Sequence, residues 1–296
     1  MESIQSDFSF HPAIQAWFAQ RFPEATDVQR RVWPAVAAGE NLVITAPTGS
    51  GKTLSAFLYA LDRLLSGVWS TGQVRVLYVS PLKALNSDIA RNLIKPLAEI
   101  REVARGMGIS LPEVQVFTRS GDTPERERRA MARQPPEILI TTPESLSLLL
   151  TSDRGRAMLR GLESVILDEI HAVASNKRGS YLMSAVERLV LLSGEFQRIA
   201  LSATVRPLDR VCAFVGGYEE LRGRYTPRTV RAISSADSKR FEVSVRCPEQ
   251  IEERLVEGQR YPAIVSDVAE LTRKNRSTLI FANNRKMTEK IARMLN

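Results

Sequence analysis

Residues 41–65, NLVITAPTGSGKTLSAFLYALDRLL, are the stretch of this 296-residue chain that decides its fold. They open with the apolar, β-branched run Leu42–Thr45, which is typical of a strand buried on both faces. A glycine-rich turn follows, and after it apolar residues recur at the spacing of one buried helical stripe. This stripe consists of Leu54, Phe57, Leu58, Leu61, Leu64 and Leu65. A strand, a turn and a helix in that order are typical of α/β domains.

The turn itself, APTGSGKT, has the residues of a phosphate-binding loop, with alanine where the pattern usually begins with glycine. Gly49 and Gly51 allow the backbone to approach a phosphate closely, and the N–H groups at the start of the following helix point to the same place. We therefore expect Lys52 to neutralise the β and γ phosphates of ATP and Thr53 to bind Mg²⁺ through its hydroxyl. The nucleotide-binding segment comprises Ala46, Pro47, Thr48, Gly49, Ser50, Gly51, Lys52 and Thr53.

A second apolar run, Ser164–Leu167, ends in two carboxylates, Asp168 and Glu169. Strand ends in a parallel sheet line the ligand crevice, so both carboxylates are expected beside the phosphate loop. Asp168 is then a ligand of Mg²⁺, usually through water, and Glu169 orients and deprotonates the attacking water. His171 is placed to sense the phosphate state or to link the site to its neighbours. Without the phosphate loop, such an acidic pair would more often be the start of a helix.

Further apolar runs alternate with helical periods along the chain. They are Val74–Val79, Val114–Phe117, Ile138–Thr141, Arg198–Leu201 and Thr278–Phe281. Strands that alternate with helices predict an α/β fold with a parallel sheet flanked by helices.

The pattern changes after Ser202, which indicates a second domain. We expect an edge strand at Phe241–Val245, a domain boundary near residue 250, and a new helix that begins near Pro262 and leads into the strand TLIFA. The chain stops one helix after that strand. The sequence therefore predicts a first domain over 1–250 and, over 251–296, a linker and the truncated start of a second domain.

Composition limits the class of protein. The chain is 44% hydrophobic and 25% charged, and no uncharged apolar stretch is long enough to span a bilayer. The N-terminus has no basic segment followed by an apolar one, so we expect no membrane association and a cytoplasmic location. The two cysteines, Cys212 and Cys247, form no CxxC motif and have no pair of histidines nearby, so structural thiols are expected.

The net charge of +8 leaves two interpretations open. Residues 270–296 hold seven Lys or Arg against two Glu, and residues 222–240 hold six against one Asp, so each stretch carries +5. Such a distribution favours a polyanionic partner, or it is simply a solvated charged surface.

Thr26 and Gln29 form a Thr-x-x-Gln pair ahead of the phosphate loop. The Gln29 amide has the groups needed to recognise the edge of adenine, but the same spacing is that of a capping box at a helix start. The two interpretations do not exclude each other.

Six motifs occur in an order that resembles the superfamily 2 helicases of the DExH type. They are APTGSGKT at 46–53, PLKAL at 81–85, TTPE at 141–144, DEIH at 168–171, SAT at 202–204 and TLIFANNR at 278–285. Other stretches resemble the Lhr-type (large helicase-related) group, among them FHPAIQAWF at 10–18 and LSATVRP at 201–207. The resemblance covers essentially the entire chain.

The resemblance implies a RecA-like first domain, the start of a second, and ATP-driven movement on a nucleic-acid strand. The implied substrate is single-stranded or forked DNA, with RNA or an RNA–DNA hybrid as alternatives, and the implied direction is 3′ to 5′, in DNA repair. The residues implied to contact nucleic acid are Pro81, Lys83, Arg119, Gly121, Thr142 and Pro143. Ser80-Pro81 and Thr142-Pro143 each combine an N-cap with a helix-compatible proline, which suits phosphate groups and ignores base identity. Ser202, Ala203 and Thr204 are implied to couple the ATP state to domain movement.

The chain departs from the family pattern at one point. The arginine-finger motif, Gln-x-x-Gly-Arg-x-x-Arg, does not occur in it. Such a finger raises the rate by roughly 10³ to 10⁵, so we expect residues 1–296 to bind ATP with little turnover. Two other function classes stay open: a nucleic-acid clamp that uses ATP as a switch, and a P-loop enzyme that acts on a small molecule or a protein.

Overall fold

The structure is a computed structural model that describes residues 9–47, 49–203, 205–235, 242–245 and 257–295. Within these ranges, the side chains of residues 83–88, 91, 257–261 and 263 are not described. The chain divides into two compact units, Met1–Ser238 and Lys239–Asn296. The predicted boundary near residue 250 stays a prediction.

The first unit is built on a seven-stranded sheet in the order β3-β4-β2-β5-β6-β1-β9. Every pair of neighbouring strands is parallel, which confirms the predicted parallel sheet. The strands are β1 (Asn41–Thr45), β2 (Val76–Val79), β3 (Val116–Arg119), β4 (Ile138–Thr141), β5 (Ser164–Leu167), β6 (Gln197–Ser202) and β9 (Val230–Ser234). Strands β2 and β3 each begin two residues later than predicted.

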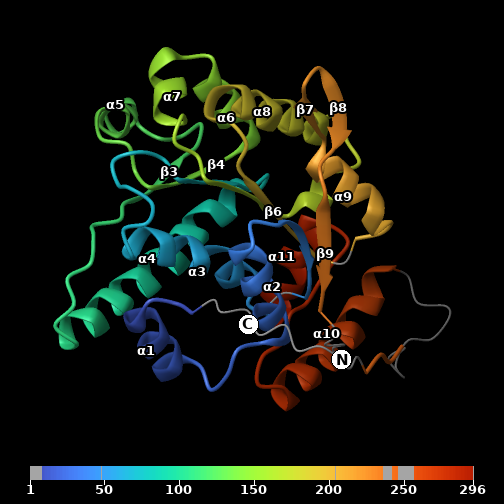
Figure 1. Ribbon diagram of the computed structural model, residues 1–296. Coiled ribbons are helices and arrows are strands. Elements are labelled where there is room, and N and C mark those ends of the chain that lie inside the picture. The colour runs from blue at the N-terminus through green and yellow to red at the C-terminus, as the bar shows by residue number, and fades with distance from the viewer. Residues whose placement is uncertain (1–8, 48, 204, 236–241, 246–256, 296) are drawn as a thin grey trace, which may run out of the picture. The chain divides into compact units, whose positions relative to one another are not determined.

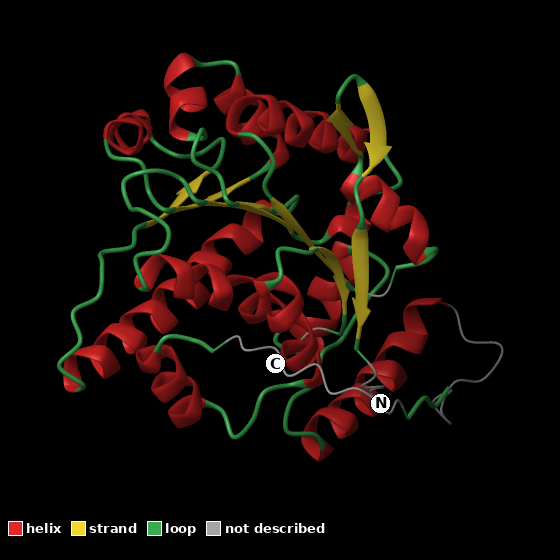
Figure 2. Ribbon diagram, in the orientation of Figure 1, coloured by secondary structure: helices red, strands yellow, loops and turns green. Residues whose placement is uncertain are grey.

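Helices cover both faces of this sheet (Figures 1 and 2). One face packs against α1 (Pro12–Arg21), α2 (Asp27–Ala37), α3 (Lys52–Leu65) and α4 (Lys83–Gly106). The other packs against α5 (Glu125–Arg133), α6 (Pro143–Leu150), α7 (Asp153–Met158), α8 (Lys177–Ser193) and α9 (Leu208–Gly216). Successive strand residues alternate between the two cores: Leu42 and Ile44 belong to the first, and Val43 belongs to the second. Strands buried on both faces explain why the strand runs in the sequence are continuously apolar.

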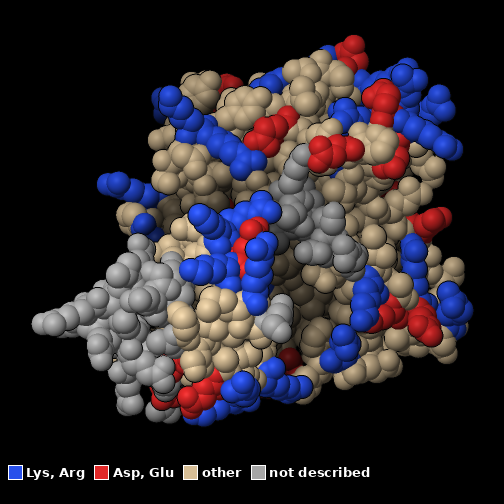
Figure 3. Space-filling view, turned by 180° about the vertical axis from the view of Figure 1, so that it is seen from behind, with Lys and Arg blue, Asp and Glu red and all other residues tan. Residues whose placement is uncertain are grey.

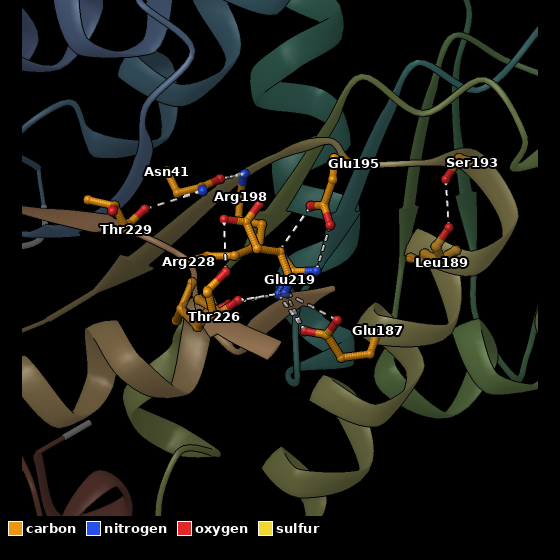
Figure 4. A network of polar contacts seen from close by, with 12 residues as sticks. Asn41, Glu187, Leu189, Ser193, Glu195, Arg198, Glu219, Thr226, Arg228 and Thr229 are labelled. Atoms are coloured by element: carbon orange, nitrogen blue, oxygen red, sulfur yellow. Dashed lines mark hydrogen bonds and ion pairs between the residues drawn. The ribbon is translucent and has the colours of Figure 1, made fainter. Parts of the chain in front are cut away.

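A buried arginine joins β6 to its neighbours (Figure 4). The side chain of Arg198 is fully buried, and its guanidinium donates to Glu187 of α8 at 2.8 Å and to the carbonyls of Val215 and Gly216. Arg228, just before β9, pairs with the same Glu187 at 3.0 Å and with Glu195 at 2.7 Å. The network therefore fixes the approach to the last strand of the sheet.

The prediction of an edge strand at Phe241–Val245 was wrong over its described part, because residues 242–245 form no strand. The edge strand is β9, which pairs with β1 from Asn41↔Val230 to Thr45↔Ser234. It was hidden in the basic stretch because only Ile233 of β9 is buried, so no continuous apolar run marks it. A separate two-stranded sheet, β7 (Tyr218–Leu221) and β8 (Arg224–Pro227), precedes it.

The described part of the second unit contains α10 (Glu257–Lys274) and α11 (Arg285–Leu295). Pro262 lies inside α10, so the predicted helix start near that residue was wrong. The predicted strand Thr278–Phe281 was also wrong: it is not a strand here, and Leu279 and Phe281 are 79% and 85% exposed. A strand needs a hydrogen-bonded neighbour, and the described residues of this unit include none. Among the described residues of the whole chain, no helix is both long and apolar enough to span a bilayer.

Candidate nucleotide and nucleic-acid site

The phosphate loop and the acidic pair lie at the same edge of the sheet. The loop follows β1, the acidic pair follows β5, and β6 lies between these two strands with its terminal Ser202 at the same edge. Two strand spacings separate β1 from β5, which is roughly 10 Å. The backbone N–H of Ala46 donates to the carbonyl of Ser202 at 3.3 Å, so loop and strand end are in contact.

The loop has the backbone that its glycines predict. Gly49 and Gly51 have φ of +82° and +83°, a region that other residues rarely adopt. Gly51 caps α3 without a side-chain hydrogen bond, so the first N–H groups of α3, which include that of Thr53, stay available. The ammonium of Lys52 donates to the carbonyls of Ala46 and Pro47, the latter at 2.8 Å. Thr48 lies outside the described residues.

An unsatisfied hydroxyl in the loop is the observation that tests its fit to a phosphate. The Oγ of Ser50 is buried and has no hydrogen-bond partner among the described residues. A buried polar atom without a partner is costly, and a phosphate oxygen is an acceptor that would satisfy it. The residues present therefore fit a bound phosphate group.

The Thr26–Gln29 pair forms the predicted capping box at the start of α2. Its position also supports the loop, because the Thr26 hydroxyl donates to the carbonyl of Ser50 at 3.1 Å. Gln29 is buried, and a side chain at Gly51 would come within 2.8 Å of its amide nitrogen. The capping box is confirmed, whereas recognition of adenine by Gln29 stays a proposal.

Both carboxylate oxygens of Asp168 accept a hydrogen bond. The buried Tyr78 hydroxyl of β2 donates to Oδ2, and the backbone N–H of Glu169 donates to Oδ1 at 2.9 Å. Burial raises the pKa of Asp168, and the Tyr78 hydrogen bond and the charge of Lys52 oppose the rise. Burial, followed by the carboxylate, also raises the pKa of Tyr78, which keeps the phenol a donor. Tyr78 was not predicted, because a tyrosine within an apolar strand run reads as core.

Glu169 and His171 connect the acidic pair to the end of β6. Glu169 has φ 48° and ψ 40°, a left-handed backbone that is unfavourable outside glycine and is found at functional sites. The Nδ1 of His171, in the 3₁₀ turn Ile170–Ala172, lies 3.2 Å from a Glu169 oxygen and 3.3 Å from the Ser202 hydroxyl. The N–H of Ala203 donates to the same Nδ1 at 3.4 Å. Thr204 lies outside the described residues.

The strand-end loops expected to contact nucleic acid differ in their caps. Thr142 caps α6 by accepting from the N–H of Ser145 at 3.3 Å, with Pro143 in the first turn, as predicted. The predicted cap at Ser80-Pro81 was wrong, because Leu82 is the N-cap of α4 and makes no side-chain cap. The Ser80 hydroxyl instead accepts from the N–H of Leu82 at 3.3 Å, which delays the helix. The side chain of Lys83 is not described.

The remaining loop, residues 119–121, begins at Arg119, the last residue of β3. The hydroxyl of Thr141 donates to the carbonyl of Arg119 at 2.8 Å, so the ends of β3 and β4 are joined. Gly121 is exposed. Arg178 of α8 pairs with Glu144 of α6 at 2.6 Å and lowers the pKa of that carboxyl.

The charge of the surface does not decide between the two interpretations of the net charge. Figure 3 views the protein from behind, and over the upper part of this face Lys and Arg side chains stand beside Asp and Glu side chains. A mixed surface of this kind is typical of solvated charge as well as of local binding sites.

The fold and the site define a class: a RecA-like domain of the P-loop nucleoside triphosphatases, with the loop and the acidic strand end at one edge of a parallel sheet. The chain belongs to the DEAD/DEAH box helicase family, whose model matches residues 26–211.

Similar proteins confirm the resemblance to the Lhr-type group. The Lhr helicase/probable uracil glycosylase of Mycolicibacterium smegmatis is 43% identical over 97% of this chain and 18% of its own length. The ATP-dependent helicase Lhr-Core protein 2 of Thermococcus barophilus is 43% identical over 94% of this chain and 32% of its own length. The structure of Mycobacterium smegmatis helicase Lhr bound to ssDNA and AMP-PNP aligns with a TM-score of 0.84 at 41% identity, over 97% of this chain and 36% of that one. The chain thus spans about a third or less of these relatives.

Proposed function

We propose that this chain is the ATP-binding and strand-binding part of an ATP-dependent helicase that moves along a single nucleic-acid strand. The observation that carries the proposal is the meeting of three motifs at one sheet edge, where Ser202 contacts both the phosphate loop and His171 of the acidic segment. The Lhr structure that resembles this chain holds ssDNA and AMP-PNP, which supports the same two ligands here.

The nucleotide would be held by Lys52, by the N–H groups of the loop and by Ser50. Thr53 and Asp168 would hold Mg²⁺, an ion that needs only one or two protein oxygens besides phosphate and water. Bound ATP would supply the phosphoanhydride whose hydrolysis drives movement, and Mg²⁺ would neutralise the charge of its phosphates. Glu169 would orient the attacking water and accept its proton. No cluster of three or more metal-ligating side chains occurs among the described residues, which fits such a sparsely ligated ion.

The coupling role belongs to the contacts of His171. Its ring lies between Glu169, which would handle the water, and Ser202 and Ala203 of the SAT motif. A change at the γ-phosphate that moves Glu169 would therefore move the end of β6. We assign Ser202, Ala203 and Thr204 to this coupling.

The strand would lie along the carboxyl edge, over Pro81, Lys83, Arg119, Gly121, Thr142 and Pro143. Helix starts and glycine-containing loops bind phosphates without reading bases, so we expect no sequence preference. The proposed substrate is single-stranded or forked DNA, with RNA or a hybrid as alternatives. Movement from 3′ to 5′, a part in DNA repair and a cytoplasmic location belong to the same proposal.

The test is the binding of a fluorescent single-stranded oligonucleotide, measured by anisotropy with and without AMP-PNP and Mg²⁺. We expect affinity that falls steeply with salt and changes when the nucleotide binds. Absence of strand binding at low salt would contradict the proposal. In the longer protein, movement along a labelled strand separates a translocase from the alternative, an ATP-switched clamp.

A further inference from the structure

An arginine-lined cavity of about 390 Å³ lies at the β3 edge of the sheet, between α5 and α7. Arg119 of β3, Arg128 and Arg129 of α5, and Arg154 of α7 contribute to its walls. Two carboxylates also line it, Glu125 and Asp153, and these are paired with Arg129 and Arg156. Figure 1 shows these three elements gathered at the upper left of the first unit. The phosphate loop follows β1, five strands away, which is roughly 24 Å. The cavity is therefore separate from the nucleotide site.

Two of these arginines have no counter-ion in the part of the chain that the structure describes. Arg129 pairs with Glu125 at 3.0 Å, but no carboxylate of the described residues lies within ion-pair distance of Arg119 or Arg128. Burial and then the charge of Arg128 lower the pKa of Arg119, and Glu125 only partly opposes this. Two partly buried cations side by side are unfavourable unless an anion joins them.

Arg128 also has an unused donor. Its Nη2 donates to the carbonyl of Gly121 at 2.7 Å, whereas its Nε is buried and has no hydrogen-bond partner among the described residues. One part of this guanidinium thus holds the 119–121 loop, and another part is left for a ligand. A guanidinium presents several donors in one plane, an arrangement that matches a phosphate group.

The cavity borders the path that the strand would take. The Arg119 carbonyl accepts from the Thr141 hydroxyl, and Thr142, the cap of α6, follows directly. A strand that lies over the starts of α4 and α6 therefore reaches Arg119 next along the same edge.

We propose that Arg119 and Arg128 together bind one phosphate group of the nucleic-acid strand, beyond the last helix start on its path. This site rests on the proposed function and extends it to α5, which none of the six motifs includes. It contributes affinity and register along the strand, and it carries no base preference because it contacts only the backbone.

The test compares Arg119→Gln and Arg128→Gln with the matched control Arg129→Gln, whose arginine lines the same cavity but is already paired. Glutamine at either position removes the guanidinium and its charge and leaves a shorter polar side chain. Oligonucleotide affinity is measured by anisotropy over a range of salt. For each of the two variants we expect the log–log salt slope to fall by about 0.7, the value for one lost phosphate contact on a single strand. If variant and wild type bind equally at 1 M salt, the variant then binds roughly fivefold more weakly than wild type at 0.1 M salt.

The control tests whether the effect is specific to Arg119 and Arg128, and the double variant tests whether the two residues share one phosphate. Arg129→Gln is expected to keep the wild-type slope, and Arg119→Gln/Arg128→Gln to lose little more than either single change, since both residues serve one phosphate. Arg128→Lys, which keeps the charge, should retain most of the slope. Unchanged melting temperature and AMP-PNP affinity show that each variant is folded.

Three outcomes would overturn the site. If wild-type protein binds the strand and both glutamine variants keep its slope, the inference fails while the proposed function stands. If the variants lose affinity for tripolyphosphate but not for the strand, the cavity serves a small phosphorylated ligand instead. If wild-type protein does not bind the strand at all, the proposed function itself fails.

Discussion

Asp168 is a carboxylate buried at the carboxyl end of β5, where its charge is costly to the fold. Burial raises its pKa above the ordinary value of 3.8 despite the Tyr78 hydrogen bond. A carboxyl with a raised pKa binds its proton more tightly in the folded state. Asp168 therefore contributes stability below about pH 3.8, and this contribution is lost as the pH rises through the pKa of Asp168 in the folded state. At neutral pH the ionised group is retained at the expense of stability.

The corresponding prediction concerns Asp168→Asn. Asparagine keeps Oδ1 as acceptor for the Glu169 N–H, its Nδ2 can donate to the Tyr78 hydroxyl, and the charge is removed, so we expect the ligand-free protein to gain roughly 0.5 to 2 kcal/mol of unfolding free energy at pH 7. The gain should shrink as the pH is lowered, because the raised pKa lets wild-type Asp168 take up its proton and lose its charge. Urea denaturation at pH 7 and at lower pH measures both effects. A variant that is less stable than wild type at pH 7 would contradict this account of Asp168.

Glu169 has a separate role in the proposed mechanism, because it follows Asp168, the proposed metal ligand, and contacts His171 from a left-handed backbone. Glu169→Gln is expected to leave AMP-PNP affinity within about twofold of wild type, since the side chain holds neither phosphate nor metal. In the longer protein, where an arginine finger would support turnover, removal of a general base should slow single-turnover phosphate release by roughly 10² to 10⁴. Wild-type release by this variant would remove Glu169 from the chemistry.

At the scale of elements, the arginine network makes β6, α8 and the start of β9 depend on one another. Among the described residues, Glu187 pairs with both Arg198 and Arg228, whereas Glu195 pairs with Arg228. Loss of Glu187 leaves the fully buried Arg198 without its carboxylate, whereas loss of Glu195 leaves Arg228 its pair with Glu187, so the first loss is the more harmful.

This difference predicts a graded result for two glutamate variants. Glu187→Ala should lower the unfolding free energy by roughly 3 kcal/mol. Glu195→Ala, the matched control, should lower it by roughly 1 kcal/mol or less, because that carboxylate is about half exposed. Denaturation in urea gives both values. Equal losses would show that Arg198 does not depend on Glu187.

The elements that could be predicted from the sequence are those marked by an uninterrupted apolar run or by characteristic glycines. Strands β1, β4 and β5 are buried on both faces, so their apolar runs marked them, and Gly49 and Gly51 marked the loop. Strand β9 could not be found, because an edge strand with one buried residue in a basic stretch has no such run. Tyr78 was missed for a different reason: its role depends on the pairing of β2 with β5, which the sequence does not contain.

At the scale of the whole molecule, the parallel sheet brings together motifs that are far apart in the chain. Lys52 and Asp168 are 116 positions apart, yet the charge of one acts on the carboxyl of the other because β1 and β5 flank β6. The proposed strand path uses the same edge further along, from α6 toward β3. A single edge of one sheet would thus hold both the nucleotide and the strand, as the proposed coupling between them requires.

The central claim is that the loop ending in Lys52 and Thr53 and the acidic pair at Asp168 hold one magnesium-bound nucleotide together. Calorimetric titration with AMP-PNP, with and without Mg²⁺, tests it most directly on wild type and on Lys52→Ala. We predict magnesium-dependent binding by the wild type and roughly hundredfold weaker binding by the folded variant, because a charge-assisted contact to the phosphates is lost. Equal affinity of the two proteins for AMP-PNP would contradict the account.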